Sequence, residues 1–214
     1  MTTTPIAEQE LMGAVAAERQ DLAILLRDLP EDAWDAATLC AGWRVREIVA
    51  HVTMPFRYGT ARFIGEMLRS GGRFNAMADR CARRDAAQIP AAALAAALSD
   101  NASNPWKPPG GGLTGALTHD VVHGLDWTVP LGIDRRVPEE RLRIVLDAVT
   151  GTGALKHFGT DLAGIELRAE DVGWSLGSGE QLTGAAQDLL LVICGRKLPS
   201  GRLNGASAQR FSAT

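Results

Sequence analysis

Residues 118–127 read THDVVHGLDW and contain two of the four histidines of the chain. His119 and His123 are four residues apart, so in a helix both imidazoles lie on one face. A third histidine, His51, lies in another amphipathic segment, residues 45–52. Three imidazoles that converge from two helices would bind a divalent metal and leave it open positions, as in a catalytic site. The pattern therefore predicts a helical protein with a candidate metal site.

Simpler interpretations of the histidines stay open. Paired histidines also occur on solvated helix faces, and a lone buried histidine is commonly just hydrogen-bonded. No glutamate stands between His119 and His123, so the hydrolytic HExxH pattern is absent. Asp120 falls off the ligand face of a regular helix, whereas Asp126 could orient an imidazole or bind substrate. Imidazole suits several ions, so zinc is the default metal, with nickel or iron as alternatives.

Composition excludes several classes of protein. The chain has 214 residues, of which 46% are hydrophobic, enough for one large domain with a smaller appendage. A formal net charge of −3 gives no footprint for nucleic acid or an anionic membrane. No signal peptide pattern and no membrane-spanning apolar run is present. Three cysteines without CxxC spacing indicate reduced thiols, so we expect a soluble, cytoplasmic protein.

Local sequence patterns predict mostly helices, and the hydrophobic pattern changes to that of strands near the C-terminus. We expect one long helix over residues 43–68, kinked or broken one residue before Pro55. Residues 74–86 are basic and are expected to be irregular. After residue 158, two alternating segments predict strands, and residues 184–195 predict a helix. This β-β-α unit is too small to be stable alone.

Three segments together resemble one known family. Residues 34–52 contain Trp34, then TLCAGWRVREIVAHV, similar to the "W…T.C.GW.V.DL.AH" signature of the mycothiol-dependent maleylpyruvate isomerase family. Residues 118–132 resemble its second signature, and residues 171–196 resemble its C-terminal domain. The resemblance implies a mainly α protein, with a DinB-like four-helix bundle over residues 1–158 and a small α/β domain over residues 159–214.

The resemblance also implies the roles of particular residues. By position, the metal ligands are His51, His119 and His123. In the characterised isomerase the earlier member of the later pair is a glutamate. Imidazole at position 119 raises the net charge of the site by one unit, which makes bound water or thiol more acidic.

A low-molecular-weight thiol, typically mycothiol in actinobacteria, is the implied co-substrate. The metal would stabilise its thiolate, so that no protein cysteine is needed as nucleophile. Arg196 matches an arginine that reaches the family's active cleft, although it could equally be a solvated arginine after a helix. Arg196 and Asp126 are therefore the catalytic candidates. Trp43 and Arg57 are the candidates for cofactor binding, with interhelical packing or surface charge as their simpler roles.

Three functions compete on this basis. The leading hypothesis is a metal- and mycothiol-dependent transferase or isomerase that acts on a small electrophile, as a monomer or homodimer. The second is a non-catalytic stress protein that binds metal and thiol without turnover. The third, a metal-dependent hydrolase, is weaker because Asp120 or Asp126 would have to serve as the base.

Overall fold

The computed structural model describes residues 7–151 and 153–213. These residues form a mainly helical fold with one small four-stranded sheet, which confirms the predicted fold class. By compactness the chain divides into an N-terminal unit, Met1–His123, and a C-terminal unit, Gly124–Thr214. No helix in the described part of the chain is long and apolar enough to cross a membrane.

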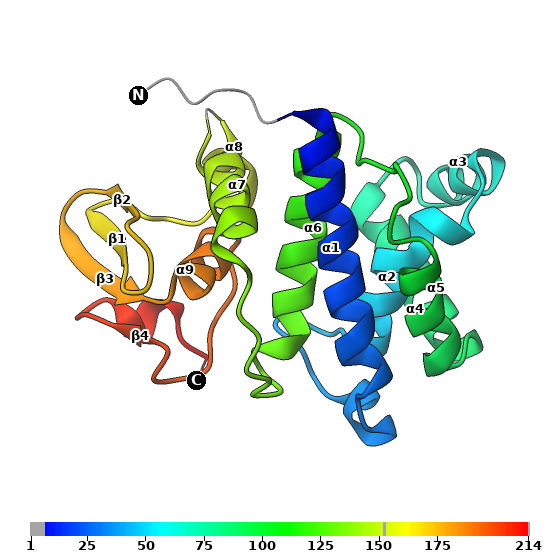
Figure 1. Cartoon of the computed structure of the whole chain (residues 1–214), viewed down its shortest axis with the longest axis horizontal. Helices are drawn as coiled ribbons and strands as arrows, with labels where there is room; N and C mark the ends of the chain where they lie inside the picture. The colour runs from blue at the N-terminus through cyan, green and yellow to red at the C-terminus, as the bar shows by residue number, and fades with distance from the viewer. Residues whose placement is uncertain (1–6, 152, 214) are drawn as a thin grey trace. The chain divides into compact units, whose positions relative to one another are not determined.

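The N-terminal unit is built from helices (Figure 1). Helix α2 packs against α4 and α5, and α1 packs against α5. The boundary between the two units falls inside α6, Gly112–Thr128. The other elements are α1 (Glu8–Arg27), the 3-10 helix η1 (Glu31–Asp35), α2 (Val45–Arg57), α3 (Thr60–Arg69), α4 (Phe74–Gln88) and α5 (Ala91–Asp100).

The predicted single helix over residues 43–68 is two helices, and the break lies elsewhere than predicted. Helix α2 continues through Pro55 to Arg57, and the chain leaves the helix at Tyr58, whose backbone is extended. Pro55 has no backbone N–H, so the carbonyl of His51 loses its helical hydrogen bond, yet the helix continues for two more residues.

Residues 74–86, predicted to be irregular, lie in α4, so that prediction is wrong. The buried face of α4 consists mainly of small side chains, which give a weak hydrophobic pattern. Ion pairs join α4 to α3: the carboxylate of Glu66 accepts from Arg80 at 2.6 Å and from Arg84 at 2.7 Å. Glu66 is 3% exposed, so these bonds satisfy a buried charge.

The C-terminal unit combines helices with the sheet. Its first helix after α6 is α7 (Glu139–Thr150), and α8 (Ala154–Phe158) follows. The sheet has the order β2-β1-β3-β4, with β1 and β3 parallel and the outer pairs antiparallel. Its remaining elements are β1 (Ile165–Ala169), β2 (Ser175–Gly177), β3 (Glu180–Gly184), α9 (Ala186–Ile193), β4 (Leu203–Asn204) and the 3-10 helix η2 (Ala208–Phe211).

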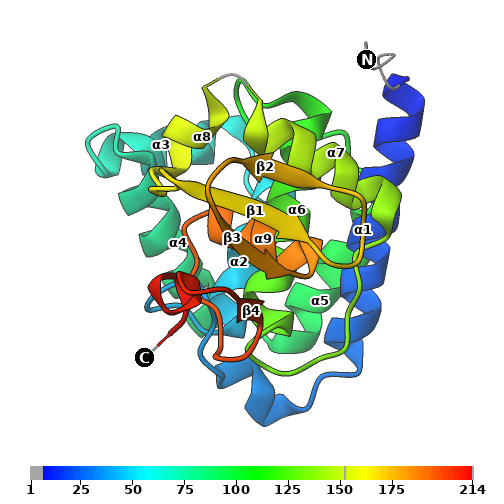
Figure 2. The same ribbon diagram turned by 90° about the vertical axis from the view of Figure 1, so that its left-hand side faces the viewer.

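Helix α9 covers one face of this sheet (Figure 2). Leu167 of β1 pairs with Leu182 of β3, and both side chains are fully buried. The structure thus contains the predicted two strands and helix, together with two further strands. The predicted domain boundary after residue 158 coincides with the end of α8. Compactness divides the chain inside α6 instead, so the domain boundary remains a prediction.

Gly179 lies at a point of the sheet where a side chain cannot be accommodated. Its φ is +127°, and an added Cβ would lie 2.2 Å from the carbonyl oxygen of Gly164. We expect Gly179→Ala to lower the free energy of unfolding by more than about 1 kcal/mol in urea titrations. Gly173→Ala is the control, because a Cβ there meets nothing within 4 Å. Equal effects of the two substitutions would contradict this explanation.

The Glu66 ion pairs predict a pH dependence of stability. Hydrogen bonds from Arg84 and Arg80 lower the pKa of Glu66 from 4.5 to about 2. A lowered pKa in the folded state gives stabilisation that is complete above pH 4.5 and is lost as the pH falls towards 2. Glu66→Gln should therefore be less stable than wild type at neutral pH, and the difference should shrink below pH 4.5 in urea titrations. A difference independent of pH would show that the charge of Glu66 does not matter.

Candidate metal centre

The segment before α2 forms a tight turn that leads directly into the site. The hydroxyl of Thr38 accepts from the backbone N–H of Cys40 at 3.2 Å and donates to the carbonyl of Trp43 at 2.8 Å. Gly42 has a φ of +78°, which a residue with a side chain rarely adopts. At the start of α2, the carboxylate of Glu47 accepts from the backbone N–H of Arg44 at 2.8 Å. The TLCAGWRVRE stretch is thus a capped turn.

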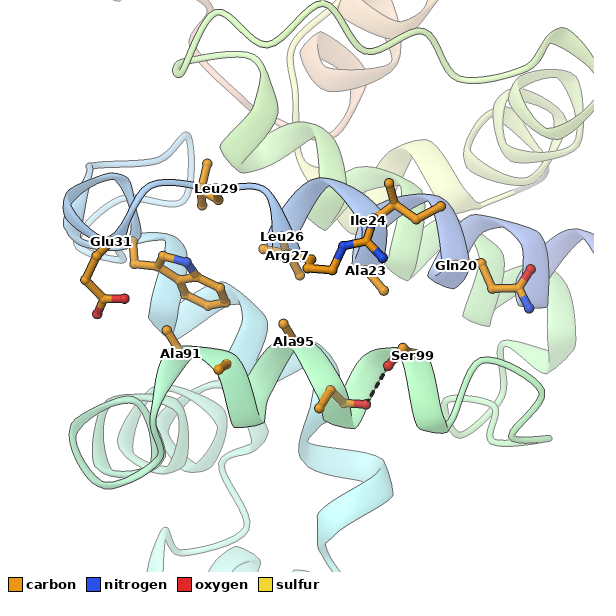
Figure 3. Close-up of a pocket in the computed structure, with 13 residues that line it drawn as sticks. Gln20, Ala23, Ile24, Leu26, Arg27, Leu29, Glu31, Ala91, Ala95 and Ser99 are labelled. Atoms are coloured by element: carbon orange, nitrogen blue, oxygen red, sulfur yellow. Dashed lines mark hydrogen bonds between the residues drawn. The ribbon is translucent and has the colours of Figure 1, made fainter.

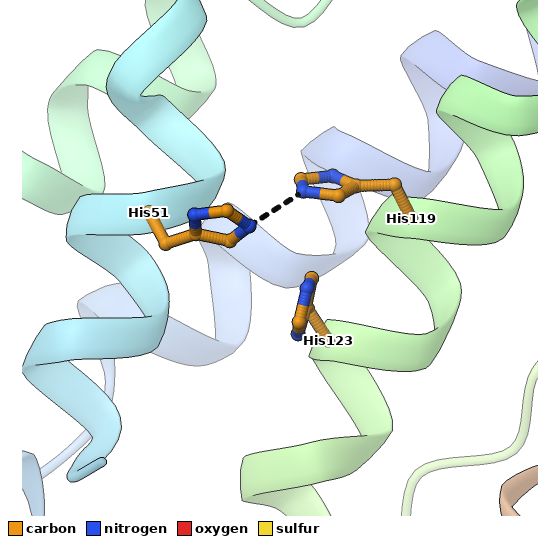
Figure 4. Close-up of side chains that lie close together, drawn as sticks. All are labelled: His51, His119 and His123. Atoms are coloured by element: carbon orange, nitrogen blue, oxygen red, sulfur yellow. Dashed lines mark hydrogen bonds between the residues drawn. The ribbon is translucent and has the colours of Figure 1, made fainter. Parts of the chain in front are cut away.

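The structure brings the three predicted ligand histidines together (Figure 4). His51 comes from α2, and His119 and His123 come from α6. Nε2 of His119 lies 3.1 Å from Nε2 of His51. One ligand atom from each ring lies within 4.8 Å of the others. The ring centroids are 4.8 to 5.1 Å apart, so each imidazole contacts both of the others.

These distances fit a shared divalent ion. Zinc–imidazole bonds are about 2.0–2.1 Å long, so two nitrogens bound to one zinc lie roughly 3 Å apart. The observed Nε2–Nε2 distance of 3.1 Å matches this spacing. A hydrogen bond between two neutral imidazoles accounts for the same distance, but it gives no role to the third ring. His51 is 7% exposed, whereas His119 and His123 are partly exposed, so the cluster is reachable from solvent.

The Nδ1 atoms of the α6 histidines contact other groups. Nδ1 of His119 lies 3.0 Å from Oδ1 of Asp120. Nδ1 of His123 lies 4.0 Å from Sγ of Cys40. Metal-bound histidines commonly use their second ring nitrogen in this way, which fixes the ring and leaves the first nitrogen for the ion. The sequence analysis placed Asp120 off the ligand face and assigned no role to Cys40. Neither the His119–Asp120 contact nor the His123–Cys40 contact was therefore predicted.

Two tryptophans flank the imidazoles. The ring of Trp43 lies 5.1 Å from that of His51, and the ring of Trp106 lies 5.5 Å from that of His119. Trp43 is anchored because its Nε1 donates to Asp79 at 2.7 Å. Hydrogen bonds from Arg83 and Trp43 hold the pKa of Asp79 below its ordinary value, so this carboxylate stays an acceptor. Trp43 was a candidate from the sequence, whereas Trp106 was not, because it lies in a proline- and glycine-rich loop.

Arg57 points its guanidinium into an ion-pair network between α2 and α4. Nη1 of Arg57 donates to the buried carboxylate of Asp85 at 2.5 Å, and Nη2 donates to the carbonyl of Ala50 at 2.6 Å. The hydroxyl of Tyr58 donates to the same carboxylate at 2.9 Å, and burial raises the pKa of that tyrosine. These bonds give Arg57 a structural role, and cofactor binding by Arg57 remains a prediction.

The two catalytic candidates form an ion pair in the C-terminal unit. Arg196 donates to both oxygens of Asp126, from Nε at 2.7 Å and from Nη2 at 2.9 Å. Helix α9 ends at Ile193, and Gly195, with a φ of +77°, lies between its C-cap and Arg196. Burial raises the pKa of the neighbouring Cys194 thiol to about 12, so it is no nucleophile at neutral pH. The pairing was not foreseen, and the catalytic roles of both residues remain predictions.

A separate groove of about 530 Å³ lies between α1 and α5 (Figure 3). Alanines of α5, including Ala91 and Ala95, form one wall, and Ala23 and Leu26 of α1 form the other. No histidine of the cluster lines this groove. The candidate chemistry therefore lies outside it.

A mainly helical fold with a small sheet and a three-histidine cluster defines a class of candidate metal-binding bundle proteins. Residues 15–104 match the family model described as the mycothiol maleylpyruvate isomerase N-terminal domain. Over these residues the match confirms the resemblance to this family seen in the sequence. The matched residues include His51, whereas the histidine pair of α6 lies beyond them.

Solved structures support the fold over nearly the whole chain. A crystal structure of the mycothiol-dependent maleylpyruvate isomerase superposes with a TM-score of 0.55 at 16% identity and covers 97% of both chains. A mutant of that enzyme with a histidine replaced by alanine gives a TM-score of 0.54 at 15% identity, again over 97% of both chains. No curated protein sequence matches this chain significantly.

Removing any one histidine of the cluster should weaken metal binding. We expect wild-type protein to bind about one zinc ion, and His51→Ala, His119→Ala and His123→Ala each to bind it far more weakly, because two imidazoles chelate less strongly than three. Elemental analysis after dialysis against dilute zinc measures this. Cys40→Ser should retain the ion, which would show that the sulfur beside His123 is not a ligand. Undiminished zinc in all three histidine variants would exclude the site.

Proposed function

We propose that this protein is a metal- and mycothiol-dependent enzyme, an isomerase or transferase that acts on a small electrophile. The observation that carries the proposal is the convergence of His51, His119 and His123 in a chain whose residues 15–104 match the N-terminal domain of the isomerase family. The solved neighbours are named as a mycothiol-dependent isomerase, and the likeness extends over 97% of each chain.

The donor set favours zinc, with nickel and iron as alternatives, because neutral imidazole binds all three. A divalent ion held by three histidines keeps an open position, where it would stabilise a bound thiol as thiolate near neutral pH. The protein's own cysteines are not needed for this chemistry. Two of the three, Cys81 and Cys194, are buried.

The surrounding residues have definable tasks in this proposal. Trp43 and Trp106 hold the imidazole rings in place and exclude water from one side of each. Arg196, which Asp126 holds in a bidentate pair, is proposed to bind negative charge on the substrate. Asp126 lies in α6, three residues after His123. The Arg196–Asp126 pair is therefore attached to the helix that carries two of the proposed ligands.

The hydrolase alternative loses support because both candidate bases are engaged. Asp120 bonds to the guanidinium of Arg19 at 2.7 Å, and Asp126 bonds to Arg196. Each carboxylate therefore already shares its oxygens with a cation. A non-catalytic protein that binds metal and thiol is the remaining competitor. The cytoplasmic location and a monomeric or dimeric state remain predictions.

A thiol titration tests the proposal directly. Protein loaded with cobalt in place of zinc should develop a thiolate-to-metal absorption band when mycothiol is added, because the open position accepts sulfur. S-methyl mycothiol is the matched control, since it has no ionisable thiol and should give no such band. No binding at millimolar mycothiol would contradict the proposed co-substrate.

Turnover separates the enzyme from the non-catalytic protein. If mycothiol binds, a panel of small electrophiles should reveal thiol-dependent conversion, and Arg196→Lys should reduce it while leaving the cobalt–thiolate band unchanged. Lysine keeps the charge but loses the bidentate geometry. Thiol binding without conversion of any electrophile in the panel would favour the non-catalytic alternative.

A further inference from the structure

We propose that Asp120 is a positioning residue that fixes the ring of His119 for metal binding, and that Arg19 holds Asp120 in place. This inference rests on the proposed metal site. Neither Asp120 nor Arg19 touches the ion in this proposal, and both act through His119. The arrangement runs from α1, which carries Arg19, to α6, which carries the other two residues.

Asp120 orients the imidazole ring of His119. Adjacent residues on a helix normally point in different directions, yet Nδ1 of His119 lies 3.0 Å from Oδ1 of Asp120. An ionised carboxylate only accepts hydrogen bonds, so Nδ1 carries the proton and donates it. The lone pair then resides on Nε2, the atom that lies 3.1 Å from Nε2 of His51. Asp120 thereby selects the tautomer that an ion requires.

The carboxylate of Asp120 is itself held in place by Arg19. Its other oxygen, Oδ2, accepts from Nε of Arg19 at 2.7 Å, and the two side chains are 1% and 0% exposed. With one oxygen bonded to each partner, the carboxylate cannot rotate without breaking a bond. Arg19 is fixed in turn, because its Nη1 donates to the carbonyl of Asn104 at 2.7 Å and its guanidinium lies 4.9 Å from the ring centre of Phe56.

The buried Arg19–Asp120 pair has a cost in folding free energy. Burying an arginine and an aspartate is unfavourable even when they pair, and apolar replacements are often as stable. Nη2 of Arg19 is buried and has no hydrogen-bond partner among the described residues, which adds to the cost. Fold stability alone therefore does not explain the pair. The orientation that it gives to His119 does.

The experiment uses two variants of the full chain. Asp120→Asn removes the charge but leaves Arg19 buried without its anion, so it is expected to fold less stably. The double variant Arg19→Met/Asp120→Leu replaces the pair by apolar groups and should be more stable than Asp120→Asn, because no charge is left buried without its partner. It should recover only part of the wild-type stability, because the backbone carbonyls that Arg19 binds lose their donor. We expect both to bind zinc about 10–100-fold more weakly than wild type in competition with a chromophoric chelator. A folded double variant with wild-type zinc affinity would overturn the proposal.

Glu66→Gln is the matched control, because Glu66 is also a buried carboxylate that pairs with arginine but lies in the α3–α4 network. Its zinc affinity should equal that of wild type, and an equal loss there would assign the effect to lost stability.

A second readout needs no metal. In nitrogen NMR spectra of metal-free protein, His119 should carry its proton on Nδ1 in wild type and lose this preference in the double variant. Wild-type protein with the proton on Nε2 would overturn the positioning role, even if zinc binds normally. Protein with the Nδ1 proton that takes up no zinc would instead overturn the proposed metal site and leave the positioning role intact.

Discussion

The buried ion pair between Arg19 and Asp120 is the interaction on which the site depends. Nε of Arg19 in α1 lies 2.7 Å from Oδ2 of Asp120 in α6, and both side chains are buried. The guanidinium also binds backbone carbonyls at residues 101, 102 and 104, in the loop that leads to Trp106. Its contact with Phe56 reaches α2, the helix of His51. One side chain thus connects every element that contributes to the histidine cluster.

This connection explains how a cluster drawn from two helices can be well defined. A metal site needs its ligands held closely, and side chains on helices achieve this when neighbouring groups fix their rings. Trp43, bonded to Asp79, packs on His51, while Asp120 and Trp106 both contact His119. Contacts with neighbouring side chains therefore restrain the orientations of the imidazole rings.

The sequence predicted the ligands but only part of what surrounds them. Helical spacing placed His119 and His123 on one face, and the turn signature identified Trp43. The convergence of His51 with the pair came from resemblance, because spacing within a helix says nothing about which helices meet. Helix α4 was missed since its buried face is mostly small. Nothing in the sequence pointed to Arg19, because its partner Asp120 is 101 residues away.

The same ion pair also affects the net charge around the candidate site. Resemblance implies a glutamate in the characterised isomerase at the position of His119, so the candidate site of this chain has one carboxylate fewer. Asp120, bonded to His119, places a carboxylate beside the site, but the buried guanidinium of Arg19 neutralises it. The net charge around a bound cation therefore stays one unit more positive than with a glutamate ligand. A more positive site holds a thiolate more firmly and makes a bound thiol more acidic. In the proposed enzyme, the exchange at position 119 would therefore favour thiol activation, and it marks the candidate ligand position at which this chain differs from the isomerase.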